Sequence, residues 1–218
     1  MERPKICAVI VNDDLKTIKE AEPSVDLFEV RIDLIDEGWQ HLPRQLNKPW
    51  IACNRTIAEG GQWREDEARR IEPLLQATEL GAGTIDIELN AKNLENIVKI
   101  IKKTAKCLLS FHDFERTPSL NEMKNIVRKQ LKAGADICKV ITIAREFEDN
   151  LTILQLIQEF PDIKIIASAM RPLGLMSRIL CPLVGGEFTY AAIEKGKESA
   201  QGQMTVSEMR RIYKMIAP

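Results

Sequence analysis

Residues 84–111 read TIDIELNAKNLENIVKIIKKTAKCLLSF and contain the unit from which we infer the fold. Two short runs rich in β-branched and apolar residues, 84–89 and 106–111, are typical of buried strands. Between them, apolar residues recur at the i, i+3, i+4, i+7 spacing of one helix face: Leu94, Ile97, Val98 and Ile101. The stretch therefore predicts a strand, a helix and a second strand in succession.

The same alternation continues in both directions from this unit. Eight strand-like segments occur along the chain: 5–11, 26–32, 50–54, 84–89, 106–111, 136–143, 163–168 and 187–191. Helical apolar faces lie at 71–78, 94–101, 153–160 and 209–216. Capping boxes mark two helix starts, Ser119 with Glu122 and Thr205 with Glu208. Helices after the first, second and seventh strands have weaker patterns.

Eight strands that alternate with helices in 218 residues are typical of an α/β fold with a parallel sheet. The alternatives are a (β/α)8 TIM barrel and an open doubly wound sheet. A doubly wound sheet usually has a glycine-rich turn after its first strand, whereas here Val11-Asn12-Asp13-Asp14 follows that strand. We therefore predict a single-domain (β/α)8 barrel over residues 1–218.

The composition argues against several classes of partner. With 31 basic and 32 acidic residues, the chain gives no electrostatic reason to expect nucleic acid or a membrane surface. We also expect no signal peptide and no membrane span, because no long apolar segment occurs. Five well-separated cysteines suit buried positions in a reducing compartment. These features predict a cytoplasmic protein.

The sequence shows no zinc motif. Its only histidines are His41 and His112, and neither lies near cysteines at ligand spacing. We interpret His41 as a surface residue. A magnesium ion held by carboxylates stays compatible with the sequence.

Polar and charged residues gather at the C-terminal ends of the predicted strands, where a barrel builds its active site. The strand ends contribute Glu29, Arg31, Arg55, Ser110, His112 and Arg171, the strand 84–89 carries Asp86 and Glu88, and Lys139 lies in the middle of the strand 136–143. The loop after the eighth strand adds Ser199 and Gln203. The charged members form either a structural network of ion pairs or a group that holds a polyhydroxylated substrate, and the residues alone leave both interpretations open.

Lys139 gives the sharpest chemical signal. It shares one face of its strand with Ile137 and Ile141, so we expect burial to lower its pKa and to favour a neutral, nucleophilic amine. A Schiff base with a carbonyl substrate is the expected use of such an amine. The alternatives are an edge-strand lysine that reaches solvent and one half of a buried ion pair.

Two neighbouring features fit the same chemistry. His112 ends the strand before that of Lys139 and suits proton transfer, although many strand-end histidines are structural. Glu59-Gly60-Gly61 is either a simple turn or a sharp bend that brings the carboxylate inward. Gly185-Gly186 precedes the eighth strand, which argues against the usual barrel phosphate site and a phosphorylated substrate.

Taken in order, these segments resemble type I 3-dehydroquinate dehydratase over nearly the whole chain. The matching stretches are Glu29-Val30-Arg31-Ile32-Asp33, Arg55 with Glu59-Gly60-Gly61, Asp86-Ile87-Glu88-Leu89, His112-Asp113-Phe114 with Thr117-Pro118, Gly134-Ala135-Asp136-Ile137 before Lys139, Ser177-Arg178, and Ser199 with Gly202-Gln203. The resemblance implies a (β/α)8 barrel, commonly a homodimer, without metal or organic cofactor. It also implies a lyase of the shikimate pathway that converts 3-dehydroquinate to 3-dehydroshikimate.

The resemblance further implies roles for three catalytic residues. Lys139 would form an imine with the ketone of the substrate, and the iminium would acidify the adjacent carbon. His112 would take that proton and then assist the loss of the C1 hydroxyl as water. Glu59 would orient and tune the histidine.

For substrate binding, the resemblance implies three groups of residues. Arg178 would pair with the carboxylate, where a bidentate fork suits the geometry. Ser199 and Gln203 would belong to a closing loop, and Glu29, Arg31 and Arg55 would hold the ring hydroxyls. Met170-Arg171-Pro172-Leu173-Gly174 departs from the more polar stretch expected at this point of the family.

Three other interpretations compete with the dehydratase. A Schiff-base aldolase of the same barrel type would cleave a carbon–carbon bond and usually bind a phosphate. A catalytically inactive barrel that binds a shikimate-pathway acid would be expected to lack the lysine, the histidine or the arginine, all of which are present. A purely structural barrel would leave the charged strand ends unexplained.

Overall fold

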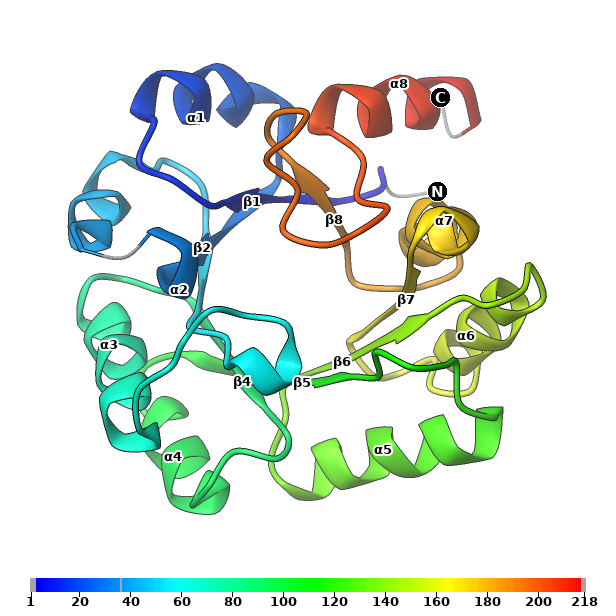
Figure 1. Cartoon of the computed structure of the whole chain (residues 1–218), viewed down its shortest axis with the longest axis horizontal. Helices are drawn as coiled ribbons and strands as arrows, with labels where there is room; N and C mark the ends of the chain where they lie inside the picture. The colour runs from blue at the N-terminus through cyan, green and yellow to red at the C-terminus, as the bar shows by residue number, and fades with distance from the viewer. Residues whose placement is uncertain (1–2, 36, 217–218) are drawn as a thin grey trace.

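The computed structural model describes residues 3–35 and 37–216, which form a (β/α)8 barrel (Figure 1). Eight strands surround the centre of the molecule, and helices lie outside them. The strands are β1 Ile6–Ile10, β2 Leu27–Arg31, β3 Trp50–Cys53, β4 Thr84–Glu88, β5 Lys106–His112, β6 Ile137–Ile143, β7 Ile165–Met170 and β8 Thr189–Ala192. Each overlaps one of the eight predicted segments, so the number and order of the strands are confirmed, although β7 begins and ends two residues later than predicted.

All strand pairs are parallel, in the order β7-β6-β5-β4-β3-β2-β1-β8. The start of the chain therefore lies beside its end, with Cys7 of β1 opposite Tyr190 of β8. Between β7 and β8, the backbone N–H of Glu187 donates to the carbonyl of Ile165. A closed parallel arrangement brings the C-terminal ends of all strands to one rim of the barrel.

The helices are α1 Leu15–Ala21, α2 Ile32–Ile35, α3 Glu67–Glu79, α4 Leu94–Ile101, α5 Leu120–Lys132, α6 Asp149–Gln158, α7 Leu175–Leu180 and α8 Val206–Ile216. Both capping boxes are present: in each, a serine or threonine and a glutamate bond reciprocally to backbone N–H groups. The three helices with weak patterns, α1, α2 and α7, are the shortest, and short 3₁₀ turns supplement them.

Apolar side chains of the strands are buried both toward the helices and within the barrel. Ile85, Ile87 and Leu109 pack with the inner faces of α3 and α4, whereas Leu108, Val140 and Ile166 belong to a second cluster with α5 and α6. All five cysteines are buried and free, and four of them lie on strands. Within the described residues, no helix is long and apolar enough to cross a membrane.

Candidate active site

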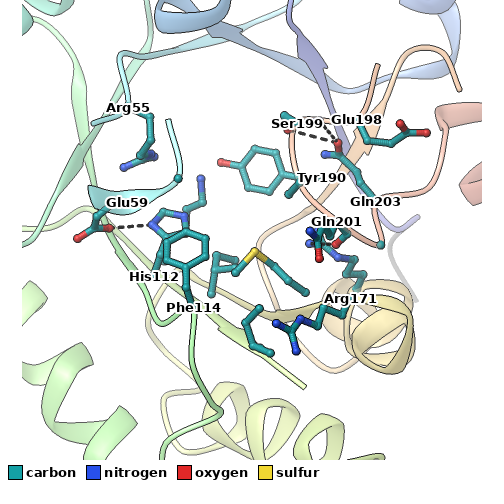
Figure 2. A pocket seen from close by; sticks show the side chains of 18 of the residues that line it. Arg55, Glu59, His112, Phe114, Arg171, Tyr190, Glu198, Ser199, Gln201 and Gln203 are labelled. Atoms are coloured by element: carbon teal, nitrogen blue, oxygen red, sulfur yellow. Dashed lines mark hydrogen bonds and ion pairs between the residues drawn. The ribbon is translucent and has the colours of Figure 1, made fainter. Parts of the chain in front are cut away.

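A cavity of about 710 Å³ opens at the rim where the strands end. It is lined by all nine residues that the sequence analysis assigned to the site: Glu29, Arg31, Arg55, Glu59, His112, Lys139, Arg178, Ser199 and Gln203. They come from β2, the segment after β3, β5, β6, α7 and the loop after β8. Figure 2 shows the labelled side chains converging from two sides of this cavity.

Lys139 lies deep in the cavity, 6% exposed, with its ammonium group between two carboxylates. Its Nζ lies 2.8 Å from Asp86 Oδ2 and 3.6 Å from Glu29 Oε1. Burial by itself lowers the pKa of Lys139, but Asp86 and Glu29 outweigh it and the net pKa is raised. The prediction that the pKa of Lys139 is lowered was wrong. The strand register that brings the carboxylates of β2 and β4 close to β6 cannot be seen in the sequence.

The same network decides the role of the acidic residues on β4. Arg55 Nη2 lies 2.7 Å from Asp86 Oδ2, and its Nη1 lies 3.1 Å from Glu88 Oε1. Behind them, Arg70 of α3 reaches Glu88 Oε2 at 2.8 Å. Asp86 and Glu88 are thus ion-pair partners, and neither lines the cavity. Arg31 is held separately, by two hydrogen bonds to Asp33 of 2.9 and 2.7 Å.

His112 and Glu59 form a hydrogen-bonded pair, with 2.8 Å between Nδ1 and Oε2 (Figure 2). Burial, then the positive charges of Arg55 and Lys139, hold the pKa of His112 well below its usual value, so the imidazole is neutral. Burial also raises the pKa of Glu59, to about 7. A neutral imidazole that donates its Nδ1–H to Glu59 leaves Nε2 free to accept a proton.

The turn that carries Glu59 requires its two glycines. Gly60 has a φ of +81°, and a Cβ there would lie 2.6 Å from the Phe114 ring. A Cβ at Gly61 would lie 2.0 Å from the backbone oxygen of Arg55. This close packing directs the Glu59 carboxylate inward, which confirms that interpretation of Glu59-Gly60-Gly61.

Arg178, on α7, forms the other side of the cavity. It is 4% exposed, and no carboxylate within the described residues pairs with it. Its Nη2 donates to the carbonyl of Gln201 at 3.4 Å, whereas its buried Nε has no partner among these residues. Burial lowers the pKa of Arg178 to about 10. The guanidinium stays protonated at neutral pH and can accept an anionic partner.

The loop between β8 and α8 contacts Arg178 and supplies uncharged polar groups. Within it, the backbone N–H and the hydroxyl of Ser199 both donate to Gln203 Oε1, at 2.9 and 3.3 Å (Figure 2). Gln201 accepts a backbone hydrogen bond from Arg171, which ties this loop to the end of β7. A Cβ at Gly202 would lie 2.5 Å from the Arg171 carbonyl oxygen, so glycine permits this close approach.

Several cavity residues were not predicted as site residues. Met170 and Arg171 belong to the stretch that departs from the family pattern, and Arg171 has a φ of +69°, an uncommon backbone conformation outside glycine. Phe114 packs beside His112 with ring centroids 6.0 Å apart. Tyr190 was missed altogether. The available signal was one large aromatic residue among the small residues Thr189, Ala191 and Ala192 of the last strand.

Metal binding has one geometric candidate among the described residues, formed by Glu29, Cys53 and Asp86, whose ligand atoms lie within 4.8 Å of one another. The ammonium of Lys139 already lies against both carboxylates. Burial raises the pKa of the Cys53 thiol well above its usual value, which disfavours the thiolate that a metal requires. This group therefore suits a lysine better than a metal ion.

A buried lysine, a neutral histidine and an unpaired arginine in one barrel cavity define the class of Schiff-base lyases that act on anionic carbonyl compounds. The comparisons with known proteins give the family. The model of the family described as Type I 3-dehydroquinase matches residues 6–218, and the chain belongs to this family.

Curated relatives and solved structures agree with that assignment. A 3-dehydroquinate dehydratase of Dehalococcoides mccartyi is 44% identical over 217 residues, which cover 99% of this chain and 97% of that protein. The crystal structure of the Geobacillus kaustophilus 3-dehydroquinate dehydratase is 26% identical, with a TM-score of 0.84 and coverage of 100% and 93%. A type I enzyme from Clostridium difficile shares the fold with a TM-score of 0.87 at 24% identity, over 98% and 92% of the two chains. The family decides against the aldolase and structural-barrel interpretations.

Proposed function

We propose that Lys139, His112 and Glu59 are the catalytic residues with which this chain performs the reaction of its family, the dehydration of 3-dehydroquinate to 3-dehydroshikimate in the shikimate pathway. The observation that carries this proposal is the placement of a buried lysine nitrogen, a neutral imidazole and an unpaired guanidinium around one cavity. The whole chain then acts as one catalytic domain.

The first step is imine formation on Lys139. Its ammonium must lose a proton before Nζ attacks the ketone carbon, and the neutral His112 is the base in the cavity that accepts it. Loss of water from the resulting carbinolamine gives a protonated imine. Its positive charge stays where Asp86 and Glu29 already stabilise the ammonium.

The second step is the elimination. The iminium withdraws electrons from the adjacent carbon, and His112 takes the proton from that carbon. His112 then gives this proton to the C1 hydroxyl, which leaves as water, and hydrolysis of the imine releases the product and Lys139. The ionised Glu59 accepts the Nδ1–H bond of His112, which fixes the tautomer and orients the ring.

Substrate binding follows from the charges that the protein leaves unpaired. Arg178 supplies the charge-assisted hydrogen bonds for the substrate carboxylate, because no carboxylate of the described residues occupies its guanidinium. Ser199 and Gln203 cover the cavity from the loop after β8. Glu29, Arg31 and Arg55 offer polar atoms to the ring hydroxyls from the opposite side.

We further propose a cytoplasmic homodimer. Large apolar side chains are exposed near the N-terminal ends of the neighbouring helices α6 and α7: Phe147, Leu151, Leu173 and Met176. Such a patch is suited to an interface with a second copy of the chain. The five free cysteines fit a reducing compartment.

The activity is tested by incubating the purified chain with 3-dehydroquinate and following the ultraviolet absorbance of the conjugated enone, with the loss of one water confirmed by mass. Wild type should form 3-dehydroshikimate, and Lys139→Met, which keeps a similar volume without the amine, should not. No product from the wild type, or full activity in Lys139→Met, would contradict the proposal.

A further inference from the structure

The ring of Tyr190, the second residue of β8, lies against the nitrogen of Lys139. The Nζ of Lys139 is 4.3 Å from the centroid of the Tyr190 ring, within the range of a cation–π contact. The side chain is 8% exposed and lines the same cavity. Phe188, which immediately precedes β8, packs edge to face against the Tyr190 ring with 5.3 Å between the ring centroids.

The positive charge on Lys139 Nζ is therefore stabilised by Asp86, Glu29 and the Tyr190 ring. The carboxylates and the ring respond differently when the ammonium becomes an iminium. Asp86 accepts a hydrogen bond from the ammonium at 2.8 Å, and Glu29 lies 3.6 Å away. An ammonium has three N–H donors, whereas a protonated imine has one. Imine formation thus removes hydrogen bonds from the carboxylates but leaves the positive charge. A cation–π contact needs only the charge, so it persists in the iminium.

The Tyr190 hydroxyl adds an independent observation. It is fully buried and has no hydrogen-bond partner among the described residues. Figure 2 shows it directed across the cavity, toward the side on which Arg55 and His112 lie. Burial and then the charge of Glu29 raise the pKa of Tyr190 well above its usual value, so the group remains an O–H donor. An unsatisfied buried hydroxyl is costly unless a ligand provides its partner.

We propose that Tyr190 is a further catalytic residue, whose ring face stabilises the positive charge of the Lys139 iminium and whose hydroxyl donates a hydrogen bond to a substrate oxygen in the cavity. This inference rests on the proposed Schiff base at Lys139. In this proposal β8 itself contributes a residue to the chemistry, whereas the loop after β8 contributes residues that bind substrate.

Two variants separate the two contributions. Tyr190→Phe keeps the ring and removes the hydroxyl, so KM should rise by about 2- to 10-fold, the value of one neutral hydrogen bond. Tyr190→Leu removes both, and the fraction of Lys139 trapped by borohydride with 3-dehydroquinate at equilibrium should fall by about 3- to 30-fold further. As the pH rises, the iminium loses its proton and the trapped fraction falls. In Tyr190→Leu, but not in Tyr190→Phe, this fall should occur at a lower pH, because the iminium without the ring loses its proton more easily.

Tyr213→Leu is the matched control. It is the other tyrosine of the chain, buried on α8, and its hydroxyl donates to the Ile179 carbonyl outside the cavity. It should leave the trapped fraction and its pH dependence unchanged. If Tyr190→Leu does not fold, fluorinated phenylalanines at position 190 keep the shape while weakening the ring's negative face, and the trapped fraction should fall with each added fluorine.

The outcomes distinguish this inference from the proposed function. A wild-type adduct on Lys139 with equal trapping and pH dependence in Tyr190→Leu, or across the fluorinated series, would overturn the role of the ring. Unchanged KM in Tyr190→Phe would overturn that of the hydroxyl. No adduct in the wild type would overturn the Schiff base itself, and the inference with it.

Discussion

The two sides of the cavity differ in how their charges are balanced. On the side formed by β2 to β6, Lys139 lies against Asp86 and Glu29, and Arg55 is paired with Asp86 and Glu88. On the side formed by α7 and the loop after β8, Arg178 has only the Gln201 carbonyl as a partner among the described residues. On the first side the charges are paired without a ligand, whereas on the second the Arg178 guanidinium has no carboxylate partner among the described residues.

This difference suits the paired side to catalysis and the unpaired side to recognition of an anionic substrate. The paired side holds a lysine nitrogen and a neutral imidazole in place before any substrate arrives, which is the preorganisation that catalysis requires. The unpaired side presents a desolvated guanidinium that only an anion can satisfy. In the proposed mechanism, an anionic hydroxyketone would complete both sides at once, with its carbonyl at Lys139 and its carboxylate at Arg178.

The largest expected effect lies on the paired side. His112→Ala should lower kcat by about 10²- to 10⁴-fold, because it removes the general acid and base of both steps. The imine should form more slowly, but some should still accumulate because the elimination that consumes it is slowed as well, so borohydride should still label Lys139 in this variant. Rapid-quench trapping beside steady-state kinetics checks both expectations. Activity near the wild-type level would remove His112 from the mechanism.

The network beneath that side should contribute strongly to stability. Arg70→Leu leaves Glu88 with one buried partner fewer, so the free energy of unfolding should fall by about 3–5 kcal/mol. Arg69→Leu, one residue away and 70% exposed at its side chain, removes only surface pairs and should change stability little. Urea denaturation of both variants tests this contrast. Equal decreases in the free energy of unfolding would show that the buried ion pair contributes no more to stability than the exposed ones.

The unpaired side should affect binding more than turnover. Arg178→Ala removes charge-assisted hydrogen bonds of about 1.5–3 kcal/mol, so KM for 3-dehydroquinate should rise by about 10- to 150-fold. Arg178→Lys should recover only part of this, because an ammonium lacks the bidentate fork. Arg171→Ala, at the exposed rim of the same cavity, is the control and should change KM much less. A larger effect at Arg171 would assign the carboxylate to the other arginine.

The smallest expected effect is on pH dependence. Glu59 has a pKa of about 7, and only its ionised form accepts the Nδ1–H bond that increases the basicity of His112. The kcat should therefore rise with pH through about 7 and then level off. Glu59→Gln should lower kcat by about tenfold or less and remove this rise. A rise that persists unchanged in the glutamine variant would point to another titrating group.

The fold could be predicted because local sequence patterns encode its strands and helices. The apolar runs at 84–89 and 106–111 and the helix face between them follow from spacing alone. The placement of His112 and Lys139 in the site could also be predicted, because His112 ends its strand and Lys139 lies within an apolar strand beside it. The predicted direction for the pKa of Lys139 was wrong, because Asp86 lies 53 residues away and only the β4-β5-β6 register brings it near.

Other features depend on tertiary structure in the same way. Tyr190 belongs to a short strand whose pattern indicates only burial, and its contact with Lys139 exists because the barrel closes β8 onto β1. The left-handed backbone of Arg171 is set by the loop after β8, which packs against it. No local spacing predicts either feature.

Every step of the proposed mechanism depends on a Schiff base at Lys139, which borohydride trapping would detect. The chain is incubated with 3-dehydroquinate, reduced, and analysed by intact mass and peptide mapping, with Lys139→Met as the control. We predict one reduced adduct, located on Lys139, and none in the variant. An unmodified wild-type chain with the ketone confirmed intact, or an adduct on another lysine, would contradict the account.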